Sequence, residues 1–383
     1  MEYKRTAQIW FVLLILLLAG CRCAPAAQNP SPSQETVSAE PAFNSPAPEG
    51  DDLEALLKNM PLAEKVAQMF FVRCPEEGAW ELAETRQPGG YILFARDFKE
   101  KTREQVTENI ASYQAAARIP MLIGVDEEGG TVTRISRYQE FRDQPFSAAR
   151  DVYQQGGWSL IEEDTLEKCI LLKSLGINVN LGPVCDIAQS KGDFIYDRCF
   201  STEPALVSEF VTRTLTISQS QRVGTVLKHF PGYGDNEDTH TGAAYDKRAL
   251  SVFETVDFLP FQAGIEAGAS CIMVAHNTVE CMDAHAPASL SPAVHRIIRE
   301  ELAFTGVILS DDLAMDAVTE YAGTVEQAAV EAVLAGNDML CCTDFEKQIW
   351  AVVEAVEDGR ISPKQIDGSV LRILNWKRQL GLL

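Results

Sequence analysis

Eight short apolar runs, separated by longer amphipathic segments, constrain the fold of this chain more than any other feature. Continuous apolar runs, in place of alternating polar and apolar residues, are typical of parallel strands buried on both faces. The runs are residues 66–72, 91–94, 121–125, 179–182, 223–227, 271–274, 307–309 and 339–341. Eight such strands with helices between them predict an α/β fold, a single (β/α)8 barrel of the TIM type.

Helix signals lie between these runs. Ser291 and Ser362 are each followed by a proline, which is typical of an N-cap and the first helical position. Residues 325–335 form a further helical pattern that Gly336 would end. The alternative fold is an open, doubly wound sheet, but no GxGxxG motif follows the first run and no P-loop occurs.

The amino-terminal 50 residues differ from the rest of the chain. Lys4 and Arg5 precede an apolar run at residues 9–19, which is shorter than the about 20 residues needed to span a bilayer. We predict a signal peptide at residues 1–20, a tether rich in Ala, Pro and Ser at residues 21–50, and a folded domain at residues 51–383. Because small residues precede Cys21, this end resembles a bacterial lipobox, which implies lipid attachment at Cys21; an ordinary signal or an uncleaved anchor is the alternative.

The formal net charge of −22 limits the partners of the chain. It argues against binding to nucleic acid and against electrostatic docking on anionic lipid, because both need Lys and Arg. We expect a neutral, sugar-like ligand, and membrane contact only through the lipid. The ten cysteines form no CxxC pair, which argues against a zinc site, and a Cys74–Cys281 disulfide remains open.

Polar residues follow four of the predicted strands, where a barrel builds its active site. Residues 228–241 combine two histidines and several acids with glycine and proline, and we predict a long loop there. Asp311 and Asp312 follow the run at 307–309. This pair has two alternative interpretations, a helix cap or a calcium site, although no EF-type loop is present. For His276 the sequence does not decide between a structural and a functional role.

Longer motifs surround these positions. They are residues 297–311, residues 228–232 followed by Gly234, and residues 124–130, 197–200, 335–339 and 369–374. Together they resemble glycoside hydrolase family 3, in its bacterial β-N-acetylhexosaminidase branch, over residues 53 to 383. Two positions depart from the branch: Tyr233 stands where histidine is usual, and Thr239 replaces a serine. Tyr233 puts the preference for the leaving group in doubt.

The resemblance implies roles for individual residues. Asp311 matches the nucleophile of the family, and Asp312 does not. His240 matches the acid/base on a mobile loop, with Asp238 orienting it. The positions that match sugar-binding residues are Asp126, Arg134, Arg198, Lys228 and His229.

These roles fit the chemistry of a retaining glycosidase, which needs a nucleophile on one face of the anomeric carbon and a proton donor on the other. Histidine has a pKa of about 6.5, so His240 suits proton transfer near neutrality. The Asp238 carboxylate would fix the tautomer of His240 and stabilise its cation. An imidazole that has given its proton is neutral, which leaves phosphorolysis open as a side reaction.

The sequence thus predicts a retaining exo-β-N-acetylglucosaminidase that acts on cell-wall or chitin fragments. We expect an exported, lipid-anchored monomer with one catalytic domain, no second domain beyond Leu383, and no metal or other cofactor. The alternatives are a β-glucosidase or β-xylosidase of the same family, and an inactive sugar-binding lipoprotein.

Overall fold

The computed structural model describes residues 50–383, except residues 189, 235, 237–241 and 243. The chain divides into two units, Met1–Pro46 and Ala47–Leu383, and everything described below belongs to the second. The predicted signal peptide, Cys21 and nearly all of the predicted tether therefore lie outside the described residues.

The strands of the described part of the chain form three sheets, and all their ladders are parallel. The sheet orders are β11-β1-β2-β3-β4-β5, β10-β8-β6 and β7-β9. The strands are β1 Phe70–Arg73, β2 Gly90–Leu93, β3 Leu122–Val125, β4 Val179–Asn180, β5 Gly224–Thr225, β6 Leu227–Phe230, β7 Tyr245–Asp246, β8 Cys271–Val274, β9 Thr278–Val279, β10 Val307–Ser310 and β11 Leu340–Cys342.

Each of the eight apolar runs overlaps a strand, so the predicted positions of the strands are confirmed, although several ends differ by a residue. One boundary was wrong, because residues 66–68 belong to helix α2, whose buried Val66 and Ala67 gave the run its apolar character. A second prediction was wrong as well: Lys228 and His229 lie inside β6 and not in a loop. Lys228 is tolerated in a buried strand because two carboxylates contact its ammonium.

Helices connect most consecutive strands, as a (β/α) repeat requires. They are α1 Gly50–Asn59, α2 Leu62–Gln68, α3 Ala79–Arg86, α4 Ala95–Phe98, α5 Arg103–Ala116, α6 Ala149–Ser174, η1 Tyr196–Arg198, α7 Pro204–Ser220, α8 Leu250–Val252, η2 Phe253–Asp257, α9 Phe258–Glu266, η3 Ala288–Leu290, α10 Pro292–Arg296, η4 Ile297–Glu301, α11 Asp316–Ala322, α12 Val325–Ala335, α13 Phe345–Glu357 and α14 Pro363–Gln379.

The predicted helix starts are present in the structure. The hydroxyls of Ser291 and Ser362 accept hydrogen bonds from the backbone N–H groups of Val294 and Gln365, and a proline follows each serine. Gly336 ends α12 with a φ of 118°, a left-handed conformation that glycine adopts without strain.

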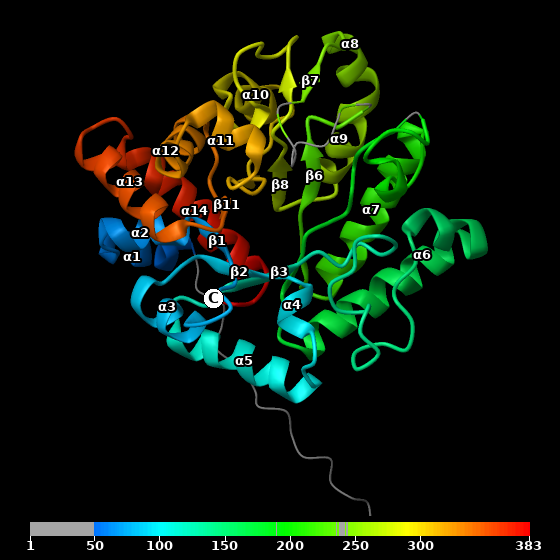
Figure 1. Cartoon of the computed structure of the whole chain (residues 1–383), viewed down its shortest axis with the longest axis horizontal. Coiled ribbons are helices and arrows are strands. Elements are labelled where there is room, and N and C mark those ends of the chain that lie inside the picture. The colour runs from blue at the N-terminus through cyan, green and yellow to red at the C-terminus, as the bar shows by residue number, and fades with distance from the viewer. Residues whose placement is uncertain (1–49, 189, 235, 237–241, 243) are drawn as a thin grey trace, which may run out of the picture. The chain divides into compact units, whose positions relative to one another are not determined.

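The strands lie in the middle of the folded unit and the long helices surround them in chain order (Figure 1). One apolar cluster joins β1, β2, β3 and β11 to the helices outside them, and a second lies between β6, β8 and helices α7 and α9. Because the strands are buried and parallel, their carboxyl ends meet at one face of the unit.

Two further findings concern the described residues. No helix there combines the length and the apolar character that crossing a bilayer requires. Cys74 is buried and Cys281 is exposed, and both are free thiols, so the disulfide that the sequence left open is not formed.

Candidate active site

A cavity of about 550 Å³ lies among the carboxyl ends of the strands. Asp126 follows β3 directly and Asp311 follows β10 directly. Six of the residues predicted from the sequence line this cavity, namely Asp126, Arg134, Arg198, Lys228, His229 and Asp311. The structure therefore brings together side chains that are separated by up to 185 positions in the chain (311 − 126 = 185).

The two remaining catalytic predictions, Asp238 and His240, lie outside the described residues, as does Thr239. Their assignment stays a prediction. The described residues on either side of this segment are considered below.

Lys228 lies at the centre of a charged cluster. Its ammonium is 2.6 Å from Asp126 Oδ1 and 2.6 Å from Glu128 Oε1, and its side chain is only 2% exposed. Burial alone would lower the pKa of Lys228, but the carboxylates of Asp126 and Glu128 outweigh burial and raise it. The lysine is therefore held as a cation beside the cavity.

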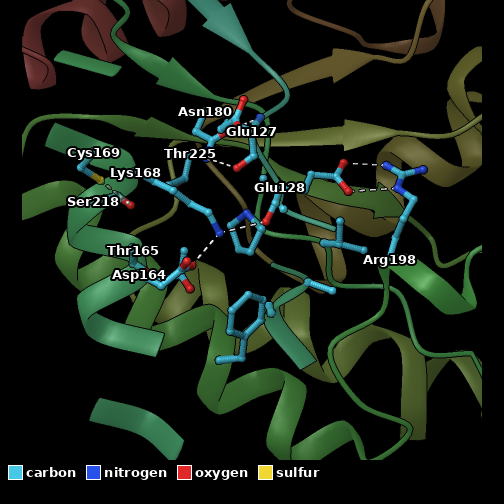
Figure 2. A pocket seen from close by; sticks show the side chains of 18 of the residues that line it. Glu127, Glu128, Asp164, Thr165, Lys168, Cys169, Asn180, Arg198, Ser218 and Thr225 are labelled. Carbon is cyan, nitrogen blue, oxygen red and sulfur yellow. Dashed lines mark hydrogen bonds and ion pairs between the residues drawn. The ribbon is translucent and has the colours of Figure 1, made fainter. Parts of the chain in front are cut away.

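Glu128 is the shared acceptor of this cluster. Arg198 donates to both of its carboxylate oxygens, at 3.0 and 2.7 Å, in the two-pronged geometry that Figure 2 shows. Burial would raise the pKa of Glu128, but Lys228 and Arg198 outweigh burial and hold it well below its usual range. Behind Glu128 the ammonium of Lys168 binds its backbone carbonyl oxygen at 3.0 Å.

His229 is held at both ring nitrogens. Asp186 Oδ2 lies 2.7 Å from Nδ1, and Arg198 Nη2 lies 3.2 Å from Nε2. Because arginine only donates hydrogen bonds, Nε2 must accept, which places the proton on Nδ1, where it is donated to Asp186. Asp186 also accepts hydrogen bonds from the backbone N–H groups of His229 and Tyr233, so it fixes the ring and the chain together.

Arg134 reaches the cavity from a loop that a buried carboxylate organises. Glu127 is fully buried and accepts hydrogen bonds from the backbone N–H groups of Arg134 and Ile135, at 2.9 and 2.8 Å, and from Ser136. The loop places the guanidinium of Arg134 3.5 Å from Asp126 Oδ2. Adjacent acids thus have different functions: Glu127 shapes the loop, while Asp126 faces the cavity.

Asp311 and Asp312 are also distinguished by their contacts. Asp312 Oδ1 accepts from the backbone N–H of Ala314 at 3.0 Å, which is the capping contact considered for this pair. Asp311 Oδ1 accepts from the backbone N–H of Asp312 at 2.8 Å. His276 Nε2 donates to the backbone carbonyl of Asp312 at 3.0 Å, while Ser289 donates to His276 Nδ1 at 2.6 Å. These contacts fix the ring of His276 against the turn that follows β10.

The chain on either side of residues 237–241 is tied down by ion pairs. Arg248 contacts Asp246 at 2.7 Å and Asp257 at 2.9 Å, and Asn236 donates to Asp246 at 2.7 Å. Gly232 has a φ of +119°, and a β-carbon there would lie 2.4 Å from Asp257 Oδ1. Both ends of the segment that carries Asp238 and His240 are therefore anchored.

Metal binding finds no support in the described part of the chain, which holds no group of three or more His, Cys, Asp or Glu side chains arranged to bind an ion. The calcium interpretation of Asp311 and Asp312 thus lacks the further ligands that it would need.

Glu128 and Asp186 are residues of the site that sequence reasoning missed. Glu128 stands two positions after Asp126, and alternate residues of extended chain share one face, so the spacing carried a usable signal. Asp186 gave no such signal, because it lies four positions beyond the run at 179–182 and reaches His229 only through the fold.

Comparison with known proteins agrees with this geometry. The model of the glycosyl hydrolase family 3 N-terminal domain matches residues 61–376. A β-hexosaminidase of Nitrosomonas eutropha is 35% identical over 268 residues, covering 67% of this chain and 74% of that protein. A β-hexosaminidase of Stenotrophomonas maltophilia is 37% identical over 255 residues, covering 66% of this chain and 75% of that protein.

A solved structure is similar as well. The family 3 β-N-acetylglucosaminidase of a Paenibacillus species superposes with a TM-score of 0.77 at 31% identity. The match covers 84% of this chain but 63% of that one, so the chain spans less than two thirds of its length. The fold is accordingly an α/β fold of the TIM-barrel type with mostly parallel sheets. With its site residues assembled at the strand ends, the chain belongs to glycoside hydrolase family 3.

Proposed function

We propose that the protein is a retaining exo-β-N-acetylglucosaminidase. The observation that carries the proposal is the meeting of Asp311 with the cluster of Asp126, Lys228 and His229 in one cavity. A carboxylate beside fixed hydrogen-bonding groups is what a glycosidase needs, and the names of the similar proteins support N-acetylglucosamine as the sugar.

In this mechanism Asp311 attacks the anomeric carbon as the glycosidic bond breaks, and His240 gives its proton to the leaving oxygen. Water then attacks the glycosyl-enzyme, His240 takes a proton from that water, and Asp311 is released as a carboxylate. Asp238 orients His240 and stabilises its cation. The family resemblance assigns the nucleophile to Asp311 and not to Asp312, whose carboxylate accepts a hydrogen bond from the backbone N–H of Ala314.

The charged cluster binds the terminal sugar. The ammonium of Lys228 and the guanidinium of Arg198 donate to sugar hydroxyls, while Asp126 accepts from them. Because these groups already hold one another in place, the sugar meets a preorganised site and little conformational entropy is lost on binding.

We further infer that the nine strands of the two larger sheets close into a (β/α)8 barrel, with β5 and β6 as consecutive segments of one barrel strand. Parallel bridges between Val184 and Lys228 and between Leu309 and Met339 support this inference, because they link the six-stranded sheet to the sheet of β10, β8 and β6 at both of its edges.

We also propose that Cys21 carries a lipid and holds the enzyme, as a monomer, at the outer face of the cell membrane. The lipobox resemblance around Cys21 supports this location. Cell-wall fragments with a terminal β-linked N-acetylglucosamine are then the natural substrates, and chitin fragments are the alternative.

The nucleophile assignment is tested with Asp311→Ala. We expect kcat/KM for an aryl β-N-acetylglucosaminide to fall at least about 10⁴-fold, with an unchanged circular dichroism spectrum, because no other group supplies the nucleophile. Asp312→Ala is the matched control, and it should lose stability more than activity. Retained turnover by Asp311→Ala would remove the assigned role.

The sugar is tested by comparing aryl β-N-acetylglucosaminide with aryl β-glucoside and β-xyloside. A preference for glucose or xylose would replace the proposed activity with that of another member of the family. Binding of N-acetylglucosamine with no turnover of any glycoside would identify a sugar-binding protein.

A further inference from the structure

Lys168 and Asp164 form a largely buried ion pair to which the proposed function gives no role. Both lie on helix α6, one turn apart, with 2.6 Å between the ammonium and the carboxylate. The ammonium of Lys168 also donates to the backbone carbonyl oxygen of Glu128 at 3.0 Å and lies 5.1 Å from the ring centroid of Phe146. Burying such a pair stabilises a fold little or not at all, so packing alone does not account for the two charges.

The carbonyl that Lys168 binds belongs to a residue of the sugar-binding cluster. Figure 2 shows Lys168 on one side of Glu128 and Arg198 on the other. The Glu128 carboxylate is 2.7 Å from Arg198 Nη2 and 2.6 Å from the ammonium of Lys228. Lys168 is not among the described residues that line the catalytic cavity. It therefore reaches the site only through Glu128, whose other end holds the two cations.

Hydrogen bonds, and not packing, hold this part of the chain on the side that faces α6. A second cavity, of about 60 Å³, lies between residues 127–129, α6 and α7, and it has room for a few water molecules. Side chains bind two consecutive carbonyl oxygens beside it: Asn180 donates to that of Glu127 at 3.2 Å, and Lys168 to that of Glu128 at 3.0 Å. Because neighbouring atoms do not fill the space, these donors determine where the carbonyls lie.

We propose that Lys168 is a positioning residue for the hydrolysis. By binding the carbonyl of Glu128, it fixes the carboxylate that keeps Lys228 and Arg198 in place for the terminal sugar, and Asp164 compensates its charge. A misplacement of about 1 Å can cost about 10²-fold in rate, so a small shift of Glu128 is sufficient to matter. The inference rests on the proposed function, because it concerns the sugar-binding end of that site.

The test is a pair-deleted variant, Lys168→Met combined with Asp164→Asn. It removes both charges at once, so no buried carboxylate is left unpaired to unfold the protein. We expect kcat/KM for an aryl β-N-acetylglucosaminide to fall about 10- to 100-fold. Most of the fall should come from a higher KM, because the cluster binds the sugar before the bond breaks. Lys168→Arg, which keeps a cationic donor beside Asp164, should retain part of the lost activity.

A Glu128→Gln background separates positioning from a merely structural role. If Lys168 acts through the Glu128 carboxylate, the pair deletion should lower kcat/KM by less than about threefold once that carboxylate is gone. Its cost in stability, measured by urea unfolding, should be the same in both backgrounds. An equal fall of kcat/KM with and without the Glu128 carboxylate would mean a general loosening of the fold and would overturn the proposal.

Proton–nitrogen NMR supplies a measurement that needs no turnover. The Nε–H of Arg198 donates to Glu128 Oε2 at 3.0 Å, so its signal should move in the pair-deleted variant. Arg213→Met is the matched control, because it breaks a pair on α7 of the same spacing, with Glu209 at 2.7 Å. That control should leave both kcat/KM and the Arg198 signal unchanged. An unmoved Arg198 signal in the pair-deleted variant, or an equal effect of Arg213→Met, would contradict the role of Lys168.

Failure of this inference and failure of the proposed function give different results. In the first case the wild type hydrolyses the aryl β-N-acetylglucosaminide, and the pair-deleted variant does so equally well. In the second case the wild type hydrolyses no glycoside. The Arg198 signal then still shows whether Lys168 positions Glu128, and only the link to hydrolysis is lost.

Discussion

Two buried lysines at opposite ends of the strands differ in what surrounds them. Lys228, at the carboxyl end, contacts two carboxylates at 2.6 Å. Lys377, in α14, is fully buried and donates to one neutral acceptor, Gln68 Oε1, at 2.7 Å. The pKa of Lys228 is raised, whereas burial lowers the pKa of Lys377 to about 7.

The difference shows how the chain separates binding from stability. Burial disfavours both ammonium groups, and only a nearby negative charge reverses the effect. Lys228 keeps its charge and presents it to a ligand at the cavity. With a pKa of about 7, Lys377 is only about half charged at neutral pH, so its burial weakens the fold below pH 10.5 and contributes nothing to the site.

The largest effect is expected from Lys228→Met. This change leaves Asp126 with only Arg134, at 3.5 Å, and Glu128 with only Arg198, so two largely buried carboxylates each lose an opposite charge. We expect a loss of about 3 to 5 kcal/mol in the free energy of unfolding and a fall of at least about 10³-fold in kcat/KM. Urea unfolding and aryl β-N-acetylglucosaminide kinetics provide the two measurements.

Lys65→Met is the matched control, because Lys65 forms a partly exposed ion pair with Asp367 at 2.7 Å. That pair should contribute less than about 1 kcal/mol and leave the kinetics unchanged. If Lys228→Met kept activity within tenfold of the wild type, the cluster would not be the sugar-binding end of the cavity.

The contrast between the lysines also shows what the sequence could predict. Lys228 was identified as a site residue because it belongs to a motif beside His229 and Gly232. The eight strands were predicted because burial on both faces leaves continuous apolar runs, a local signal. Residues 66–68 were wrongly assigned to a strand because the buried end of a helix and a buried strand have the same apolar composition.

Pairings between distant segments were beyond sequence reasoning. Lys377 looks like a solvent-exposed helix lysine until α14 is placed against Gln68, which is 309 positions away in the chain. Asp186 and Lys168 are comparable cases, because neither belongs to a recognised motif and only the fold brings them to His229 and Glu128.

A smaller effect is expected from Asp186→Asn, which tests whether Asp186 orients the neutral imidazole of His229. The change replaces a charged acceptor of three N–H groups, two of them from His229. We expect kcat/KM to fall by about 10- to 100-fold, because the ring loses a charge-assisted hydrogen bond that orients it. Nitrogen NMR of the imidazole should show a weakened hydrogen bond at Nδ1–H, while Arg198 still keeps the proton on Nδ1.

A merely structural role would not move that NMR signature. Asp338→Asn removes an equally buried carboxylate, which binds Arg372 at 3.0 Å, and it should reduce stability with the Nδ1–H signal of His229 unchanged. An Asp186→Asn protein with the wild-type Nδ1–H signal would contradict the positioning role.

The smallest effect is expected from Lys377→Met, which removes the costly lysine of the comparison. Between pH 7 and 10.5 the unfolded chain holds a proton on Lys377 that the folded protein lacks, so this group makes stability rise with pH. Methionine has no such dependence, and the variant should be more stable than the wild type by roughly 1 kcal/mol at pH 7.

Above about pH 10.5 the order should reverse, because the lysine is then neutral in both states. The wild type keeps its hydrogen bond to Gln68 Oε1, whereas the variant leaves that buried oxygen without a donor. Urea unfolding of both proteins across this pH range locates the crossing, with exposed Lys58→Met as the control. If the free energies of unfolding of the two proteins changed with pH in parallel, Lys377 would be charged in the folded protein at neutral pH. The two lysines would then differ in their hydrogen-bonding partners but not in their charge.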